Sequence, residues 1–340
     1  MSRSDLEAVA TAMVAKDKGL LAADESNATI AKRLEKIGSA STEEQRRSYR
    51  ELLFTTPGIA QWISGVILYD ETIRQKTRDG VPFPDYLTKL GIIPGIKVDT
   101  GAKPLAGFPG ETITEGLDGL RERLAEYYKL GARFAKWRAV IDIGDGIPSH
   151  GAIAANAHAL ARYAGLCQEQ NIVPIVEPEV LMDGGHTQER CDAVTSGVLA
   201  EVFAQLDRQR IHLEGMILKP NMVISGKKCP TRATPEQVAA ATVRCLKRHV
   251  PGAVPGIMFL SGGQTPAEAA LHLSLMNRLG GLPWQLSFSY GRALQDAALS
   301  AWGGKPGNFA AGQKEFEKWS RLNGLARGGS FKAGMEQLAA

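Results

Sequence analysis

The sequence is poor in cysteine and has no long hydrophobic run. Its 340 residues include four cysteines, and neither a C-x-x-C pair nor a spacing typical of zinc ligands occurs among Cys167, Cys191, Cys229 and Cys245. Free thiols in a reducing compartment are therefore the default interpretation. The N-terminal stretch has no apolar segment of the signal-peptide type, and no window is long enough to span a membrane. These gaps predict a cytoplasmic protein with no membrane partner.

An excess of one charge is also missing. The chain has 40 lysines and arginines against 36 aspartates and glutamates, and its formal net charge is +4. This mildly basic balance argues against a nucleic-acid partner but is compatible with anionic small molecules. No pair of histidines has the i, i+3 or i, i+4 spacing of a helical metal site among His150, His158, His186, His212, His249 and His272. We therefore expect no metal site, and nothing in the sequence indicates another cofactor.

Short apolar runs separated by longer amphipathic stretches are the main regularity of the chain. Eight such runs are predicted strands, at 19–24, 63–70, 92–99, 133–140, 172–180, 215–220, 255–262 and 284–291. Helix starts of the capping-box type occur between them, in "STEE" (Ser41 and Glu44), "TPEQ" (234–237) and "TPAE" (265–268).

Eight alternating strand–helix units favour an α/β fold of the (β/α)8 barrel type. A doubly wound sheet is the alternative, but "AADESNAT" lacks the glycine-rich turn that usually follows its first strand. Residues 1–302 are predicted to form the barrel as a single domain. Residues 303–340 are predicted to be a C-terminal tail, partly mobile, with one short helical piece.

Charged residues stand at the ends of five predicted strands, where barrel enzymes carry their catalytic groups. The list comprises Asp24, Lys97 with Asp99, Lys136 with Arg138, Glu177 with Glu179, and Lys219. Side chains two apart share one face of a strand, so Lys136 and Arg138 point the same way and Trp137 points the opposite way. If Trp137 faces the outer helices, the charged side chains converge on the barrel axis and shift each other's proton affinities.

Each of these residues alone has an ordinary structural explanation. Lys219 could extend its long stem to water, and the other charges could form ion pairs around the barrel rim. The recurrence of charge at five strand ends favours catalysis over either explanation. Because the chain shows no metal site, a lysine imine is the natural alternative for activating a carbonyl group.

Glycine and hydroxyl side chains follow the last two strands, in "SGGQ" and "SYGR". Loops after strands seven and eight of such barrels often bind phosphate through backbone N–H groups and a helix N-terminus. The predicted phosphate-binding residues are Ser261, Gly262, Gly263, Ser289, Gly291 and Arg292. Ordinary glycine turns are the alternative interpretation.

The chain resembles the class I, Schiff-base family of fructose-bisphosphate aldolases. The stretches that carry the resemblance run in family order from about residue 18 to residue 300: "GLLAADES", "GIKVDTG", "ETITEGLDGLRERLAEYYKLGARFAKWR", "VPIVEPEVL", "ILKPNMV", "FLSGGQ" and "SFSYGRALQ". The resemblance implies a (β/α)8 barrel that cleaves fructose 1,6-bisphosphate reversibly into two triose phosphates, without metal or cofactor. It also implies a homo-oligomer, either a tetramer or a dimer.

The resemblance also implies roles for individual residues. Lys219 would form the imine, Lys136 would be the neighbouring cation that favours its neutral amine, and Glu177 would be the acid/base. Asp24 would take the C4 hydroxyl proton, and Glu179 would hold the lysines in place. For the C1 phosphate it implies Ser261, Gly262, Gly291 and Arg292, and for the C6 phosphate Ser26, Lys97, Arg138 and, more weakly, Arg33.

The chain departs from the family pattern in two places. It has no tyrosine after Tyr290, although animal members end in a tyrosine that assists proton exchange at C3. It also carries Ala28 where a glycine is common, and alanine resists positive φ, so we expect a reshaped loop near the C6 phosphate. Fructose 1-phosphate and sedoheptulose 1,7-bisphosphate therefore stay open as substrates, as does another imine-forming barrel aldolase. A binding protein on the same fold is the non-enzymatic alternative.

Overall fold

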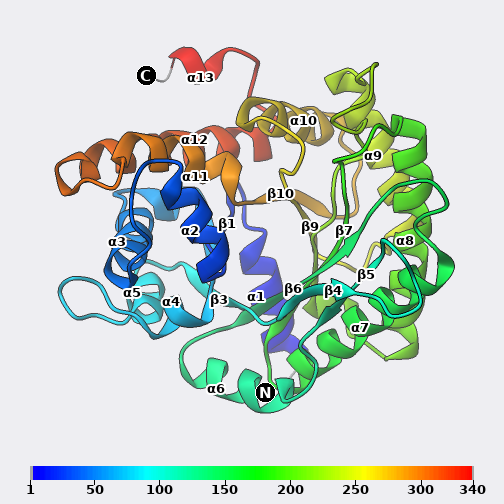
Figure 1. Cartoon of the computed structure of the whole chain (residues 1–340), viewed down its shortest axis with the longest axis horizontal. Helices are drawn as coiled ribbons and strands as arrows, with labels where there is room; N and C mark the ends of the chain where they lie inside the picture. Colours follow the sequence, from blue (N-terminus) through cyan, green and yellow to red (C-terminus); the bar gives the residue numbers. More distant parts are fainter. Residues whose placement is uncertain (1–2, 339–340) are drawn as a thin grey trace.

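A computed structural model describes residues 3–338 of the chain as one closed parallel barrel (Figure 1). Neighbouring strands follow the order β1-β10-β9-β8-β7-β6-β3-β2, and every pairing in the barrel is parallel. The eight barrel strands are β1 (Gly19–Ala22), β2 (Ile63–Leu68), β3 (Ile93–Lys97), β6 (Phe134–Ile141), β7 (Val173–Val180), β8 (Ile217–Leu218), β9 (Gly256–Phe259) and β10 (Gln285–Tyr290). The predicted (β/α)8 fold is confirmed, with all eight strands in their predicted places.

Helices surround the strands on the outside of the barrel, as the parallel connections require (Figure 1). The longer ones are α1 (Arg3–Met13), α2 (Asn27–Glu35), α3 (Glu43–Phe54), α6 (Leu120–Lys129), α7 (His150–Glu169), α8 (Gln188–Arg208), α9 (Pro235–His249), α10 (Pro266–Leu279), α11 (Arg292–Trp302) and α12 (Phe309–Arg327). The shorter ones are α4 (Asp70–Arg74), α5 (Phe83–Lys89), α13 (Met335–Leu338) and the 3-10 turns η1 (Ile59–Gln61), η2 (Leu213–Gly215) and η3 (Pro306–Asn308).

Two of the three predicted capping boxes are present. In α9 and α10 the threonines Thr234 and Thr265 accept from the third backbone N–H of the helix, and Gln237 and Glu268 reach back. The third prediction is wrong, because Thr42 rather than Ser41 caps α3 and accepts from Gln45 N. Both residues are hydroxyl N-cap types, so the sequence does not distinguish adjacent candidates.

Two parts of the chain differ from the prediction. A two-stranded antiparallel sheet of β4 (Gly101–Pro104) and β5 (Thr112–Glu115) is inserted between β3 and β6. After residue 302 the predicted short helical piece is the 19-residue helix α12, which buries Phe316 and Leu322 against the molecule. The division of the chain at residue 302 and the mobility of the tail stay predictions.

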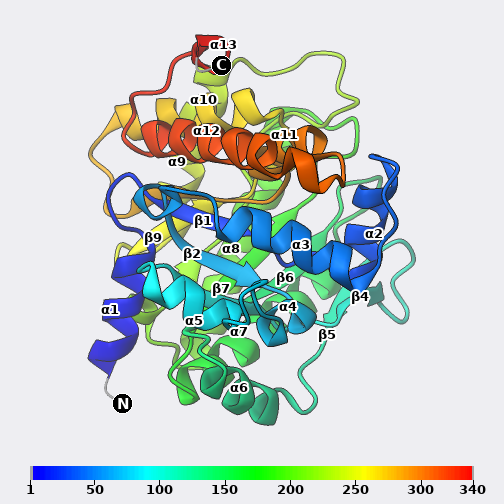
Figure 2. The ribbon, with the colours of Figure 1, turned by 90° about the vertical axis from the view of Figure 1, so that its left-hand side faces the viewer.

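Helix α1 closes the N-terminal end of the barrel. Its side chains Leu6 and Met13 pack against the inward residues Phe134, Ile175 and Ile217 in one apolar cluster. Figure 2 shows α1 at one end of the barrel and α2 with the β4–β5 sheet at the opposite end. An added Cβ on Gly95 would lie 2.2 Å from the ring of Phe134, so glycine here makes room for that ring.

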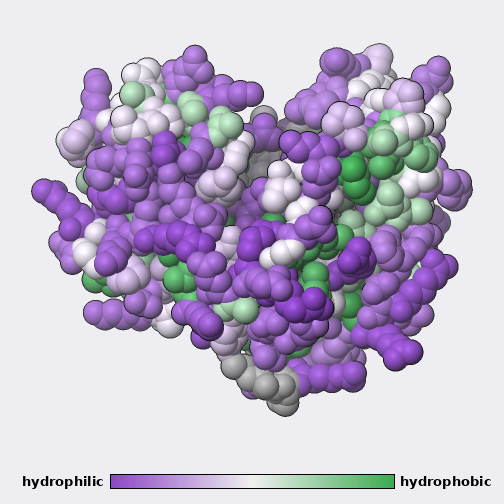
Figure 3. Space-filling view, turned by 60° about the horizontal axis from the view of Figure 1, so that its bottom comes forward, coloured by the Kyte–Doolittle hydropathy of each residue, from purple (hydrophilic) through white to green (hydrophobic). Residues whose placement is uncertain are grey.

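A second and larger apolar cluster lies between the barrel and its helices. Trp137 belongs to it and lies beside Tyr163 of α7, with ring centroids 5.6 Å apart. This confirms that Trp137 faces outward and that its neighbours Lys136 and Arg138 face the barrel axis. The face shown in Figure 3 is mostly hydrophilic, with apolar residues in small separate groups. Within residues 3–338 no helix is both long and apolar enough to cross a membrane.

Candidate active site

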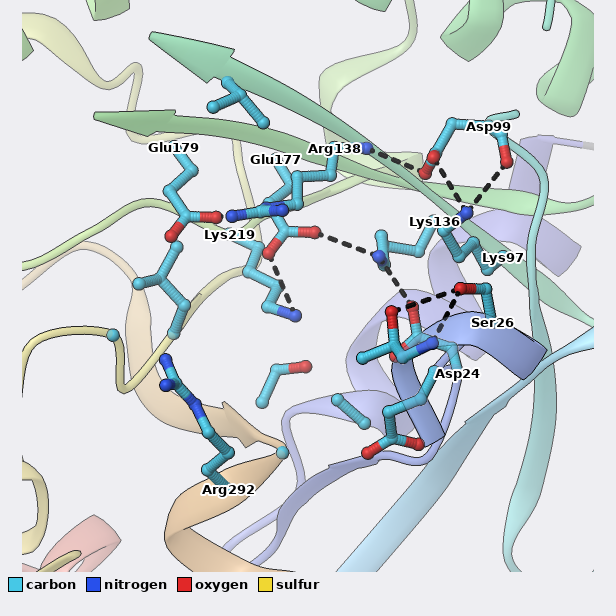
Figure 4. Close-up of a pocket in the computed structure, with 18 of the residues that line it drawn as sticks. Asp24, Ser26, Lys97, Asp99, Lys136, Arg138, Glu177, Glu179, Lys219 and Arg292 are labelled. Carbon is cyan, nitrogen blue, oxygen red and sulfur yellow. Dashed lines mark hydrogen bonds and ion pairs between the residues drawn. The ribbon is translucent and has the colours of Figure 1, made fainter. Parts of the chain in front are cut away.

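One cavity of about 360 Å³ opens at the carboxyl ends of the strands, and it is lined by residues that lie far apart in the sequence (Figure 4). Of the predicted site residues, the cavity brings together Asp24, Ser26, Arg33, Lys97, Lys136, Arg138, Glu177, Glu179, Lys219, Ser261, Gly262, Ser289, Gly291 and Arg292. Strand periodicity explains the arrangement. Every second side chain of a strand points into the barrel, so the next inward side chain after the apolar ones lies at the mouth of the barrel.

A chain of alternating charges runs across the floor of the cavity. The Lys219 ammonium lies 3.1 Å from Oε1 of Glu177, and the other oxygen of Glu177 lies 3.5 Å from Nζ of Lys136. Lys136 is also 2.6 Å from Oδ2 of Asp24. Lys219, Lys136 and Glu177 are each buried, with at most 4% of their surface exposed. Buried charges need partners of this kind, since an unpaired one would carry a large desolvation cost.

The charges in this chain shift each other's proton affinities. Burial alone would raise the pKa of Asp24, but the positive charges of Lys136 and Lys219 hold it well below its usual range. Burial would likewise lower the pKa of Lys136, whereas Asp24 and Glu177 raise it above its usual value. At neutral pH Asp24 is therefore a carboxylate and Lys136 is an ammonium.

Around this chain lie two further ion pairs. Arg138 pairs with Glu179, so Glu179 contacts this guanidinium rather than either lysine. Lys97 pairs with Oδ1 of Asp99 at 2.9 Å, and Oδ2 of Asp99 accepts from the backbone N–H of Arg138 at 3.3 Å. These contacts fix the cations Lys97 and Arg138 beside one another on adjacent strands.

Polar and cationic groups gather at two edges of the cavity. At one edge, Ser26 caps α2 and accepts from the Thr29 backbone N–H, and Lys97 lies nearby (Figure 4). At the other edge Arg292 begins α11 and faces the cavity from the side opposite Lys97 (Figure 4). Helix N-termini and cations are groups that favour anions, and the cavity has such groups at each end.

Ser289 and Gly263 lie differently with respect to the cavity. Ser289 lines the cavity, and its buried Oγ has no hydrogen-bond partner among the described residues. Gly263 does not line this cavity and faces a neighbouring one instead. It has φ of +76°, and an added Cβ would lie 2.1 Å from Cγ of Met182. Turn geometry and packing against Met182 therefore account for this glycine, and its role in phosphate binding stays a prediction.

Ala28 adopts an ordinary helical conformation. It lies in the first turn of α2, and the positive-φ residues other than glycine in the described chain are Asp17, Asn171 and Arg210. Ala28 therefore has helical backbone angles in the described structure, and the reshaped loop stays a prediction.

Sequence reasoning missed a buried network behind the cavity edge that carries Ser26 and Lys97. Glu25 receives Arg33 at 2.5 Å, Arg50 at 2.8 Å and the amide of Gln295 at 3.0 Å. Arg50, Glu25 and Gln295 are buried, whereas Arg33 also lines the cavity. The adjacency of Glu25 to Asp24 was visible in the sequence, but Arg50 and Gln295 lie within helices and carried no signal. Across residues 3–338, no group of three or more His, Cys, Asp or Glu side chains is arranged to hold a metal ion.

A (β/α)8 barrel whose strand ends bring paired lysines and carboxylates into one cavity defines an enzyme of the barrel class. Comparison with known proteins narrows this class. The family model of class I fructose-bisphosphate aldolase, the glycolytic aldolase family, matches residues 5–340. A probable class 1 fructose-bisphosphate aldolase from Xanthomonas axonopodis pv. citri is 60% identical over 98% of this chain and 100% of its own length.

More distant relatives give the same picture. Fructose-bisphosphate aldolase C of Rattus norvegicus is 52% identical, over 97% of this chain and 92% of its own. The solved structure of fructose-bisphosphate aldolase from Plasmodium falciparum, in complex with TRAP and a small-molecule inhibitor, superposes with a TM-score of 0.96 at 48% identity, covering 97% of this chain and 96% of that one. This chain belongs to the class I fructose-bisphosphate aldolase family and is an enzyme of that type, so the resemblance is confirmed.

Proposed function

We propose that the protein cleaves fructose 1,6-bisphosphate reversibly to dihydroxyacetone phosphate and glyceraldehyde 3-phosphate through an imine on Lys219, without a metal ion. The observation that carries the proposal is the buried contact of Lys219 with Glu177, 3.1 Å away, with Lys136 on the other oxygen of the same carboxylate. A lysine amine in such a pocket can add to a ketone and use the resulting iminium as an electron sink.

The first half of the reaction builds the imine. Glu177 takes a proton from Lys219 and leaves a neutral amine, which adds to C2 of the ketose. The proton that the nitrogen then loses passes to the carbonyl oxygen and gives a carbinolamine. Glu177 then protonates the departing hydroxyl, and water leaves as the C=N bond forms. Glu177 suits this role because its carboxyl group contacts both Lys219 and Lys136 and can exchange protons next to the reacting nitrogen.

The second half breaks the C3–C4 bond. Asp24 accepts the proton of the C4 hydroxyl, the electrons of the C3–C4 bond move to the iminium nitrogen, and the aldehyde product leaves. The lowered pKa of Asp24 ensures that its carboxylate is ionised when substrate arrives. Protonation of the enamine at C3 and addition of water then release dihydroxyacetone phosphate and regenerate Lys219.

Charge at the two cavity edges supports binding of a ligand with a phosphate at each end. Arg292, with Ser261, Gly262 and Gly291, would hold the C1 phosphate at the N-terminus of α11. Ser26, Lys97 and Arg138, with Arg33, would hold the C6 phosphate at the N-terminus of α2. Glu179 acts through its ion pair with Arg138 and so positions that cation.

Activity measurements test the reaction and its substrate together. We expect efficient cleavage of fructose 1,6-bisphosphate, no loss of rate with a metal chelator, and inactivation by borohydride only when dihydroxyacetone phosphate is present. Loss of activity with the chelator would contradict the metal-independent mechanism. Sedoheptulose 1,7-bisphosphate and fructose 1-phosphate are second candidates, because the same two edges and C2 pocket would accept them. Faster turnover of monophosphates than of bisphosphates would favour another imine-forming aldolase.

The wider setting follows from the family resemblance and stays a proposal. An enzyme with this activity acts in glycolysis or gluconeogenesis, or in the Calvin cycle. We also propose a cytoplasmic location and a homo-oligomer, either a tetramer or a dimer. Size-exclusion chromatography with light scattering tests the oligomeric state, and a monomer at micromolar concentration would contradict it.

A further inference from the structure

The strand that leads to Lys219 is unusually short. Strand β7 runs for eight residues, but only Ile175 and Val176 pair with β8, which ends at Leu218. One further backbone bond, from Lys219 N to Val176 O at 2.8 Å, continues the pairing. Pro220 then has no N–H to donate. The part of β7 that carries Glu177 and Glu179 therefore runs beside the Lys219 segment without a regular ladder.

The side chain of Asn221 fills this gap. Its Oδ1 accepts the backbone N–H of Val180 at 3.1 Å, directly after Glu179. Its Nδ2 donates to Met222 O at 3.1 Å and to Oγ1 of Thr195 on α8, also at 3.1 Å. Asn221 is 2% exposed and does not line the cavity. One amide thus joins the end of β7, the segment after Lys219 and helix α8.

We propose that Asn221 is a positioning residue that keeps Lys219 and Glu177 in register across the β7–β8 seam. The inference rests on the proposed imine mechanism. Proton exchange between Glu177 and the nitrogen of Lys219 depends on their 3.1 Å separation, and displacements of about 1 Å in an active site can cost about 100-fold in rate. A regular ladder would hold this separation through backbone bonds, whereas here it depends on the Asn221 side chain.

A purely structural role is the competing explanation, and the chain offers a matched control for it. Thr242 on α9 is also buried, and its Oγ1 accepts the backbone N–H of Val223 at 2.9 Å. It therefore ties a helix to the same segment, two residues further from Lys219 than Asn221. Loss of this bond should destabilise the fold in a similar way without moving Lys219 against Glu177.

The test measures kcat, KM, thermal stability and the rate of borohydride-trapped imine with dihydroxyacetone phosphate in the full-length protein. For Asn221→Ala we expect kcat and the trapping rate to fall together by about 10- to 100-fold, with KM within about threefold of wild type. For Thr195→Val, which removes the Thr195 hydroxyl and leaves Cys191 Sγ of α8 at 3.9 Å from Nδ2 of Asn221, we expect a fall of about three- to tenfold. For Thr242→Val we expect a lower Tm with kcat within about twofold.

Three outcomes overturn the proposal. Folded Asn221→Ala could keep kcat within twofold of wild type, Thr242→Val could lose as much kcat as Asn221→Ala, or KM could change instead of kcat. If Asn221→Ala does not fold, Thr195→Val against Thr242→Val decides, and equal kcat in the two contradicts the proposal. Failure of the wild-type protein to trap an imine on Lys219 would instead contradict the proposed function itself.

Discussion

At the N-terminal end of the barrel the inward positions of three strands carry Phe134, Ile175 and Ile217. Two residues further along, the same faces carry Lys136, Glu177 and Lys219. The first set packs in one apolar cluster with α1 and is fully buried, and these side chains need no polar partner. The second set is almost as deeply buried, but every member contacts an opposite charge.

These two ends differ in what burial does for the molecule. Burying the apolar end removes hydrocarbon from water, which stabilises the fold by about 25 cal/mol per Å². Burying the charged end costs desolvation free energy that the ion pairs only partly offset. The comparison shows that this barrel separates stability and chemistry along its axis. Substitutions at the apolar end should therefore lower stability more than kcat, and substitutions at the charged end should lower kcat more than stability.

The largest effect is expected from replacing the proposed nucleophile. Lys219→Met removes the group proposed to form the imine, so cleavage should fall by at least about 10⁴-fold. Because a buried charge is removed together with its desolvation cost, the melting temperature should stay near the wild-type value. Steady-state kinetics and calorimetry check the two expectations. Residual cleavage within about tenfold of wild type would show that the chemistry resides elsewhere.

A truncation at the apolar end should give the reverse signature. Phe134→Ala leaves a void beside Gly95 and should destabilise the protein by about 3–5 kcal/mol in denaturant unfolding. The kcat of the folded fraction should stay within about threefold of wild type, because Phe134 lies two residues before Lys136 on β6 and does not line the cavity. A loss of kcat matching that of the mouth variants would contradict the separation of the two ends.

The charged end should also make stability depend on acid pH. The pKa of folded Asp24 lies below its unfolded value of about 3.9, so the unfolded chain binds this proton first as the pH falls. The stabilisation from Asp24 is thus present above about pH 4 and is lost on further acidification. Asp24→Asn should show a shallower loss of unfolding free energy between pH 5 and pH 3, whereas Phe134→Ala should keep the wild-type slope. Equal slopes for all three proteins would refute this assignment.

The smallest effect is expected at the edge of the mouth. Ala28→Gly places the residue common in the family into the first turn of α2 and should cost about 0.5–1 kcal/mol of stability at most. Since Ala28 is helical and unstrained, the ratio of kcat/KM between fructose 1,6-bisphosphate and fructose 1-phosphate should change by less than about twofold. A larger change would restore Ala28 as a determinant of substrate preference.

Much of this organisation could be predicted from the sequence because the strands signal it locally. Short apolar runs predicted the eight strands, and the two-residue period placed Lys136 and Glu177 on the same face as their charged neighbours. The same rule predicted that Trp137 points away from Lys136, and Trp137 is found against Tyr163. Local pattern suffices here because a parallel barrel repeats one unit with short connections.

Features that depend on distant contacts could not be predicted. Arg50 and Gln295 meet Glu25 only because α3 and α11 pack beside β1, and neither residue breaks its helical pattern. Strand β8 is shorter than its apolar run because Pro220 interrupts the ladder and Asn221 replaces it with a side chain. Gly263 leaves room for the Met182 side chain, a contact that sequence spacing does not reveal.

The most direct test of the central claim asks which of the two buried lysines reacts. Lys136 lies between the carboxylates of Asp24 and Glu177, which hold it as an ammonium. Among the described residues, Lys219 forms its ion pair with one carboxylate, that of Glu177. The protein is incubated with dihydroxyacetone phosphate, reduced with borohydride, digested and mapped by mass spectrometry. The account predicts one reduced adduct on the peptide that contains Lys219. An adduct on Lys136, or no adduct on either lysine, would contradict it.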